Sequence, residues 1–265
     1  MNPNFGLTSK DYAQHRAGFP DSMFERLAAL GVGVAGQSVV DLGTGTGSLA
    51  RGLACRGCRV LGIDPAAEML AEARALDKLA GVRVEYRQGK AESTGLPDAS
   101  LDVVTAGQCW HWLDRPKAAA EAKRLLTPGG TVVIAHFDWI PLAGNVVRAT
   151  EELIEQHNPD WHMGGGFGLY PQWLRDLGEA GFLDLRSFTY DVDVPYSPEA
   201  WRGRIRASAG VGGSLPATGV ADFDRALGQL LAERFPAEIL PVPHRLFAVI
   251  GQAPPPLGGP SAHAD

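Results

Sequence analysis

The chain has 265 residues, of which 45% are hydrophobic and 20% charged, with a net charge of −6 and a pI near 5.6. This length and composition predict one α/β core with an insertion. No apolar run approaches the length of a membrane span, and the N-terminus lacks a basic region followed by an apolar one, so we expect a cytoplasmic protein that does not enter a membrane. The acidic balance argues against a nucleic-acid partner.

Strand and helix patterns alternate through the first half of the chain. The predicted strands are residues 38–42, 59–63, 83–87, 101–106 and 131–137. Helical patterns separate them, including residues 118–126 after Asp114, a residue type that caps helix N-termini. This alternation predicts right-handed crossovers and a parallel, doubly wound sheet.

The regular alternation of strand and helix patterns ends after residue 137. We predict insertions at 138–170, rich in Gly, Pro, Trp and His, and at 198–237, which has two helical patterns. Around them the pattern predicts a helix at 171–180, a sixth strand at 183–194 and a seventh at 246–251. We therefore expect a single domain over 1–251 with a helical cap, followed by a Pro- and Gly-rich disordered tail at 252–265.

The first predicted strand runs into a glycine-rich turn. Its apolar residues suit a central parallel strand, and Gly43, Gly45 and Gly47 permit positive φ and close approach of a ligand to the backbone. Such a turn alone also serves tight packing. The second strand strengthens the nucleotide-site interpretation because it ends in Asp64, 17 residues after Gly47, close to the roughly 20 expected for an acid that accepts ribose hydroxyls. Asp64 also suits a helix cap, which is compatible with this role.

Asp41, just before the first glycine, decides between cofactors. Its charge repels a pyrophosphate but suits an ammonium or sulfonium, which disfavours a nicotinamide-dependent dehydrogenase. The chain resembles the class I S-adenosylmethionine-dependent methyltransferases in a series of motifs. They are Asp41 with Thr-Gly-Thr-Gly, Asp64, Gly89–Glu92, Leu96–Val104 and the Leu-Leu-Thr-Pro-Gly-Gly segment at 125–130. The resemblance spans about residues 39–137. It implies a Rossmann-like sheet of seven strands, mostly parallel with a reversed last strand, and S-adenosyl-L-methionine as the cofactor.

Two further segments resemble a small-molecule branch of that family, which includes trans-aconitate methyltransferase-like proteins. They are Gln108-Cys109-Trp110-His111-Trp112, after the fourth strand, and Tyr12-x-x-His15-Arg16 with Phe19-Pro20. Tyr12 and Arg16 are four residues apart and would share one face of a helix. We expect this helix to close over the cofactor and to bring Arg16 to the cofactor's carboxylate. The alternative for Arg16 is an ion pair on the surface.

The resemblance and the strand ends together give a predicted cofactor site. Its residues are Tyr12, Arg16, Asp41, Gly43, Thr44, Gly45, Gly47, Asp64, Pro65, Met69, Ala91, Glu92, Gln108 and Cys109. Lys90 departs from the family pattern, which commonly has an acid there to accept the adenine amino group; an ammonium cannot accept a hydrogen bond. We therefore expect the adenine to be bound through the Ala91 backbone and Glu92, or to be held mainly by apolar packing.

His111 is the first candidate for a general base and His136 the second, because a neutral imidazole accepts a proton near neutral pH. A structural role between Trp110 and Trp112 is the alternative for His111. Cys55-x-x-Cys58 has no second cysteine pair, so we predict structural thiols and no metal. The dense basic cluster Arg202, Arg204 and Arg206 is interpreted as a solvated helix face.

These observations predict methyl transfer to a small-molecule acceptor by in-line displacement. The alternative from another class is a protein that binds the cofactor without catalysis, in a regulatory or assembly role. The sequence leaves open the acceptor, the methylated atom and the oligomeric state.

Overall fold

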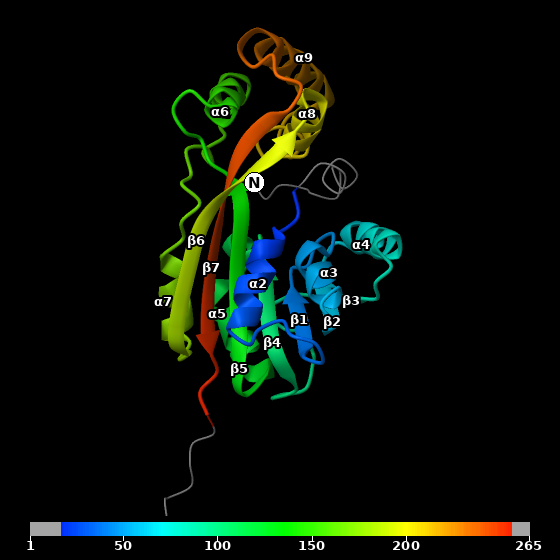
Figure 1. The fold of residues 1–265 in the computed structure, drawn as a ribbon, viewed down its shortest axis with the longest axis vertical. Helices are drawn as coiled ribbons and strands as arrows, with labels where there is room; N and C mark the ends of the chain where they lie inside the picture. The colour runs from blue at the N-terminus through cyan, green and yellow to red at the C-terminus, as the bar shows by residue number, and fades with distance from the viewer. Residues whose placement is uncertain (1–16, 256–265) are drawn as a thin grey trace, which may run out of the picture.

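A computed structural model describes residues 17–255 (Figure 1). Seven strands of this part of the chain form one sheet in the order β3-β2-β1-β4-β5-β7-β6. The parallel strands are β1 (Ser38–Leu42), β2 (Arg59–Asp64), β3 (Glu85–Gln88), β4 (Leu101–Gly107) and β5 (Leu126–Trp139). β7 (Leu240–Gln252) runs antiparallel between β5 and β6 (Leu183–Tyr196). The predicted mostly parallel sheet with a reversed last strand is confirmed.

Helices cover both faces of the sheet, which explains the apolar runs of its central strands. Val39 packs with α2 (Asp21–Ala29) and α3 (Ser48–Ala54), whereas its neighbour Val40 packs on the opposite face with α5 (Arg115–Leu125) and α7 (Gln172–Glu179). Successive strand residues point to opposite faces, so a strand buried on both sides is apolar throughout. α4 (Ala67–Ala80) packs beside β2 and β3. The Asp114 side chain caps α5 by accepting from Lys117 N–H, as predicted.

Three helices gather at one end of the long strands β5, β6 and β7, where Figure 1 shows them apart from the other helices. They are α6 (Val146–His157), α8 (Pro198–Arg206) and α9 (Ala217–Arg234), and we call them the cap lobe. Their apolar faces, with the ends of β6 and β7, enclose a core of their own, including Trp201, Phe223, Leu227 and Val242. Among the described residues, no helix is both long and apolar enough to cross a membrane.

The last two strands are longer than predicted. β7 begins at Leu240 instead of residue 246, and β6 continues to Tyr196. Pro241 and Pro243 argue against a strand because proline donates no ladder hydrogen bond. They are tolerated here because they precede the stretch in which β7 pairs with β5, so this part of β7 is paired with β6 alone. β7 also includes Gln252, which was predicted to start the tail; residues 256–265 lie outside the described range.

The boundary between α5 and β5 also differs from the prediction. α5 ends at Leu125 and β5 begins at Leu126, where the predicted helix continued and the predicted strand began at 131. The extra residues contain an irregularity in the pairing with β4. A Cβ on Gly130 would lie within 3.0 Å of the Asp102 carbonyl oxygen, so this close approach of two backbones requires glycine.

Candidate active site

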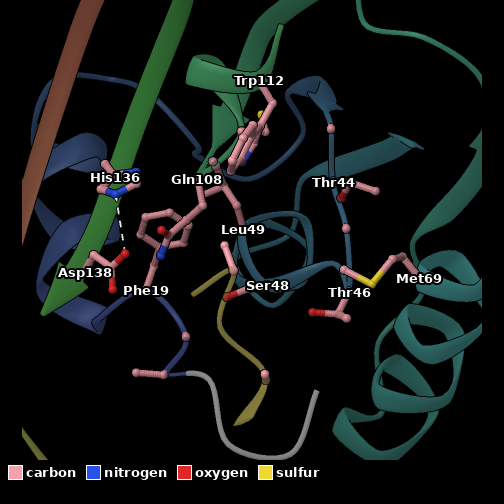
Figure 2. Close-up of a pocket in the computed structure, with 18 of the residues that line it drawn as sticks. Phe19, Thr44, Thr46, Ser48, Leu49, Met69, Gln108, Trp112, His136 and Asp138 are labelled. Carbon is pink, nitrogen blue, oxygen red and sulfur yellow. Dashed lines mark ion pairs between the residues drawn. The ribbon is translucent and has the colours of Figure 1, made fainter. Parts of the chain in front are cut away.

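A cavity of about 370 Å³ lies where the parallel strands end, between the sheet and the cap lobe. In doubly wound sheets this edge is the usual ligand site. Figure 2 shows Thr44, Thr46 and Met69 on one side of the cavity, and His136 with Asp138 on the other. Eight residues predicted for the cofactor line it: Asp41, Gly43, Thr44, Gly45, Asp64, Met69, Gln108 and Cys109. His111 and His136 line it too.

The glycine turn after β1 keeps the backbone accessible. Gly43, Gly45 and Gly47 have φ values of +62°, +56° and +76°, a region that L-residues with a side chain rarely adopt. A Cβ on Gly43 would lie 2.8 Å from the Sγ of Cys109. On Gly45 the nearest atom would be the Cε of Met69, 3.5 Å away, so the space beside this glycine is open to a ligand.

Asp41 is buried beneath the turn, with 1% of its surface exposed. Its carboxylate accepts hydrogen bonds from the hydroxyls of Thr44 and Thr105, each at 2.7 Å. Burial raises the pKa of Asp41 from 3.8 to about 6, against the lowering effect of the two hydroxyls. No ion pair with a described residue neutralises this carboxylate, and a cationic ligand group in the cavity suits it.

Asp64 ends β2 and is tied to the turn after β1. One carboxylate oxygen accepts from Gly45 N–H and the other from Ala66 N–H, both at 2.9 Å. Burial raises the pKa of Asp64, and these two backbone hydrogen bonds oppose the rise. A carboxylate oxygen can accept more than one hydrogen bond, so Asp64 retains capacity for the hydroxyls of a ligand in the cavity that it lines.

Gln108 and Cys109 follow β4 in a strained turn. Gln108 has a φ of +63°, which is rare for a residue with a side chain and is typical of sites that position ligands. Its backbone N–H donates to the Ala135 carbonyl, and its side-chain amide donates to the Phe137 carbonyl. The Cys109 thiol donates to the Leu42 carbonyl at 3.0 Å, and burial raises its pKa, which keeps it protonated.

Four residues predicted for the cofactor site lie outside the described lining of the cavity. Gly47 is the N-cap residue of α3, and a Cβ at this position would lie 2.2 Å from the Tyr86 hydroxyl oxygen. Pro65 is exposed, and Ala91 is buried in the core with Trp110. Glu92 accepts from the Asp114 N–H at 3.0 Å. Tyr12, Arg16 and the leading helix predicted around them fall outside the described residues.

The opposite side of the cavity carries both candidate bases. His111 is exposed in the short 3-10 helix Trp110–Trp112, and His136 is 4% exposed in β5. Their rings lie edge to face, with centroids 5.4 Å apart. The Nε2 of His136 is 3.7 Å from a carboxylate oxygen of Asp138, on the same face of β5 (Figure 2). Two imidazoles and a carboxylate thus come together at the strand end.

The interpretation of the arginine cluster as a solvated face is wrong for Arg204. This side chain is 3% exposed, lines the cavity, and places its guanidinium 4.4 Å above the ring of Trp139. Arg202 and Arg206 instead pair with Asp224 of α9. The signal was in the spacing: Arg202 and Arg206, four apart, share a helical face, whereas Arg204 points away from it.

Other lining residues were missed because their roles depend on the fold. Those of the turn and α3 are Thr46, Ser48, Leu49 and Arg51, and the cap lobe and its flanking segments add Met163 and Ser208. The turn residues follow directly from the glycine motif, and extending that motif into the helix would have found them. Nothing in the local sequence marks Ser208.

The described residues contain no cluster of three potential ligands that would hold a metal ion. In the Cys-x-x-Cys segment, Cys58 is buried and its thiol donates to the Val34 carbonyl at 3.3 Å, whereas Cys55 is exposed. The two thiols therefore lie in different environments.

Known proteins resemble the chain in sequence. Residues 40–134 match a family model described as a methyltransferase domain. An O-methyltransferase of ubiquinone biosynthesis from Pseudomonas paraeruginosa is 38% identical over 188 residues, which cover 64% of this chain and 80% of the relative. An uncharacterized methyltransferase of Mycobacterium tuberculosis is 33% identical over 153 residues, covering 56% of this chain; the match spans only 60% of that relative's length.

Solved structures share the fold. A candidate type II methyltransferase from Anaeromyxobacter dehalogenans superposes with a TM-score of 0.59 at 24% identity, over 91% of this chain and 99% of that one. A Haemonchus contortus phosphoethanolamine N-methyltransferase, solved with S-adenosyl-L-methionine, gives 0.55 at 19% identity, over 94% of this chain and 56% of that one. With the glycine turn and its two acids, the sequence relatives establish the conclusion that this chain belongs to the class I S-adenosylmethionine-dependent methyltransferase family.

Proposed function

We propose that the chain transfers a methyl group from S-adenosylmethionine to a hydroxyl of a small-molecule acceptor. The observation that carries the proposal is the continuity of one cavity. It runs from the glycine turn with Asp41 and Asp64 to the imidazoles of His111 and His136. A cofactor end and a proton-accepting end thus share one cavity, as in-line displacement requires.

The residues at the first end fit the cofactor's chemical groups. Asp64, oriented by the Gly45 N–H, would accept hydrogen bonds from the ribose hydroxyls, and the buried Asp41 would supply negative charge for the ammonium of the methionine moiety. The open side of Gly45 lets the cofactor approach the backbone, beside Met69. Arg16 remains a prediction for the cofactor carboxylate.

When bound, S-adenosylmethionine supplies an activated methyl group on its sulfonium, and S-adenosylhomocysteine is the leaving group. The chain then has two tasks: it aligns the acceptor oxygen with the methyl carbon, and it takes the hydroxyl proton. Alignment alone contributes roughly 7–11 kcal/mol in well-positioned reactions. The proton passes to an imidazole nitrogen, for which His111 is the first candidate and His136 the second.

The acceptor side supports a small molecule with a reactive oxygen. The cap lobe lines this side through Arg204 and residues 207–210, and an acceptor bound between them and the imidazoles would lie in a concave site, as small-molecule ligands usually do. The Pseudomonas relative is named as an O-methyltransferase, which supports an oxygen acceptor here by analogy. We further propose that the segments 138–170 and 198–237 set acceptor specificity.

Transfer of label tests the proposal. The protein is incubated with S-adenosylmethionine carrying a trideuterated methyl group and with a panel of phenols, carboxylates and amines, and products are measured by mass spectrometry. We expect a labelled methyl ether from at least one hydroxyl compound. Tight binding of the cofactor with no labelled product from any acceptor class supports the non-catalytic alternative instead.

A further inference from the structure

Asp138 lies beside His136 at the end of β5, and its two carboxylate oxygens have different surroundings. The two residues are separated by one position, so their side chains share a face of the strand, and Phe137 between them packs in a core on the other face. One oxygen of Asp138 accepts from the Trp139 N–H at 2.9 Å and from a nitrogen of Arg204 at 3.3 Å. The other oxygen lies 3.7 Å from the Nε2 of His136 (Figure 2). The carboxylate is thus held through one oxygen and faces the imidazole with the other.

Aromatic packing holds the ring of His136 in place. The ring meets those of Tyr170 and Trp173 edge to face, with centroids 4.6 and 6.0 Å away. It meets the ring of His111 in the same manner at 5.4 Å. The side chain is almost fully buried by these contacts. A ring packed in this way cannot turn freely, so Nε2 keeps its position beside Asp138.

The second ring nitrogen of His136, Nδ1, is buried and has no hydrogen-bond partner among residues 17–255. A neutral imidazole has one protonated nitrogen, which donates, and one unprotonated nitrogen, which accepts. A proton on Nδ1 would leave a buried donor unsatisfied and would point the lone pair of Nε2 at a carboxylate. Both are unfavourable, so the proton belongs on Nε2. Nδ1 is then a buried acceptor in a side chain that lines the cavity, and a hydroxyl of a ligand would satisfy it.

We infer that Asp138 is a positioning residue for His136: it keeps the proton on Nε2 and so makes Nδ1 the atom that takes the proton of the acceptor. The inference rests on the proposed function and deepens it, because it chooses between the two candidate bases and names the reacting nitrogen. As the acceptor oxygen bonds to the methyl carbon, the electrons of the broken C–S bond stay on the sulfur and the hydroxyl proton passes to Nδ1. The imidazole becomes positively charged, and the nearby carboxylate stabilises that charge.

The separation of 3.7 Å between Nε2 of His136 and the carboxylate is longer than a hydrogen bond. Catalytic hydrogen bonds are often this long before the substrate binds, and they shorten in the reacting complex. Coulomb attraction already acts at this distance, because it falls only with the inverse of the separation. The arrangement therefore suits a partner that keeps a proton on Nε2 and does not remove it.

The tautomer of His136 tests the inference without an acceptor. The protein is labelled with ¹⁵N-histidine and saturated with S-adenosylhomocysteine, and long-range ¹H–¹⁵N correlation spectra are recorded at about pH 8, where an ordinary imidazole is neutral. Protonated and unprotonated ring nitrogens have different ¹⁵N chemical shifts, and the signals of His136 are those absent from His136→Gln. We expect Nε2 to carry the proton. A proton on Nδ1 would overturn the inference.

Asp138→Asn should remove the preference for this tautomer, because its amide offers N–H donors to Nε2 and the proton then moves to Nδ1. With a hydroxyl acceptor found by label transfer, kcat should fall at least about a hundredfold, while KM and the affinity for S-adenosylhomocysteine stay nearly unchanged. Asp222→Asn, which alters an exposed acid paired with Arg225 on α9, is the matched control and should change neither the spectrum nor kcat. An unchanged kcat in Asp138→Asn would also overturn the inference.

Asp138→Asn also takes a partner from the buried Arg204. If this variant does not fold, the tautomer of the unaltered protein still decides, since that measurement leaves Asp138 in place. The expected tautomer with no labelled product from any acceptor contradicts the proposed function, and not the pairing of His136 with Asp138. A labelled product with the proton on Nδ1 contradicts the inference alone and leaves His111 as the base.

Discussion

The carboxylate of Asp64 accepts a hydrogen bond from the backbone N–H of Gly45 across 2.9 Å, and this contact joins the end of β2 to the turn after β1. The acid is thus oriented by the same turn that lets a ligand approach the backbone. One oxygen is held by Gly45 and the other by Ala66, so the carboxylate cannot rotate away from the cavity without losing both bonds. Preorganisation of this kind favours ligand binding because less freedom is lost when the ligand arrives.

Asp64→Ala should weaken S-adenosylhomocysteine binding at least about tenfold, because hydrogen bonds to a charged group contribute roughly 1.5–3 kcal/mol each. Calorimetry measures the dissociation constant. Asp222→Ala, which removes an exposed acid paired with Arg225 on α9, is the control and should leave the affinity unchanged. Unchanged affinity in the Asp64 variant would show that another group holds the ribose.

Asp41→Asn should stabilise the cofactor-free protein at pH 7 by up to about 3 kcal/mol, the equivalent of a pKa raised from 3.8 to about 6. Between pH 3.8 and about 6 the folded state binds the Asp41 proton more tightly than the unfolded state does, so the stability of the parent protein falls as pH rises through this range. The difference between variant and parent should therefore vanish near pH 4. Urea unfolding at pH 4 and pH 7 measures it.

The same carboxylate should make cofactor affinity depend on pH. A cationic ligand favours the ionised form of Asp41, so affinity should fall as pH drops below about 6, with a proton released on binding there. Asp41→Asn should bind more weakly at pH 7 and lose most of this dependence. Calorimetry in two buffers of different ionisation enthalpy detects the proton, and an unchanged pH profile in the variant would contradict the assignment.

His111→Ala should lower kcat by about 10²–10⁴ if its imidazole takes the acceptor proton, with cofactor affinity nearly unchanged. The same test on His136→Ala decides between the two histidines. Loss of activity in step with loss of thermal stability would indicate a structural role.

Gly47→Ala should destabilise the fold by at least about 1 kcal/mol through its left-handed φ, and further through the overlap with the Tyr86 hydroxyl. Adding Tyr86→Phe should restore part of this loss, since it removes the nearest atom to the new Cβ. Chemical denaturation of the single and double variants measures the coupling. Purely additive effects would show that the strained backbone alone sets the cost.

Local sequence was sufficient for most of the core. Alternation of strands and helices gave β1 with its observed bounds, and the glycine turn with Asp64 located one wall of the cavity because strand ends of a parallel sheet meet at one edge. Motif position alone assigned Glu92 to the adenine, and no sequence pattern indicated that one of its carboxylate oxygens accepts from the Asp114 N–H. The hydrogen-bond partner of a side chain decides its orientation, and that partner is often distant in the sequence.

The cap side was harder to predict because no local pattern reports it. Arg204 meets Asp138 across 66 positions of sequence, and Ser208 lines the cavity only because α8 is carried there by β6. The start of β7 at Leu240 could not be predicted because Pro241 and Pro243 argue against a strand. That rule applies to strands with a neighbouring strand on each side, and this part of β7 pairs with β6 alone.

The cap lobe has an apolar core of its own, built around Trp201 and Phe223 and separate from the two cores that flank the sheet. Its wall of the cavity therefore rests on packing that does not involve the glycine turn. Substitutions in these two places should combine additively in their effects on stability. On our proposal that the segments 138–170 and 198–237 set acceptor specificity, exchanging the cap lobe for that of a relative should change the acceptor and leave the affinity for S-adenosylhomocysteine unchanged.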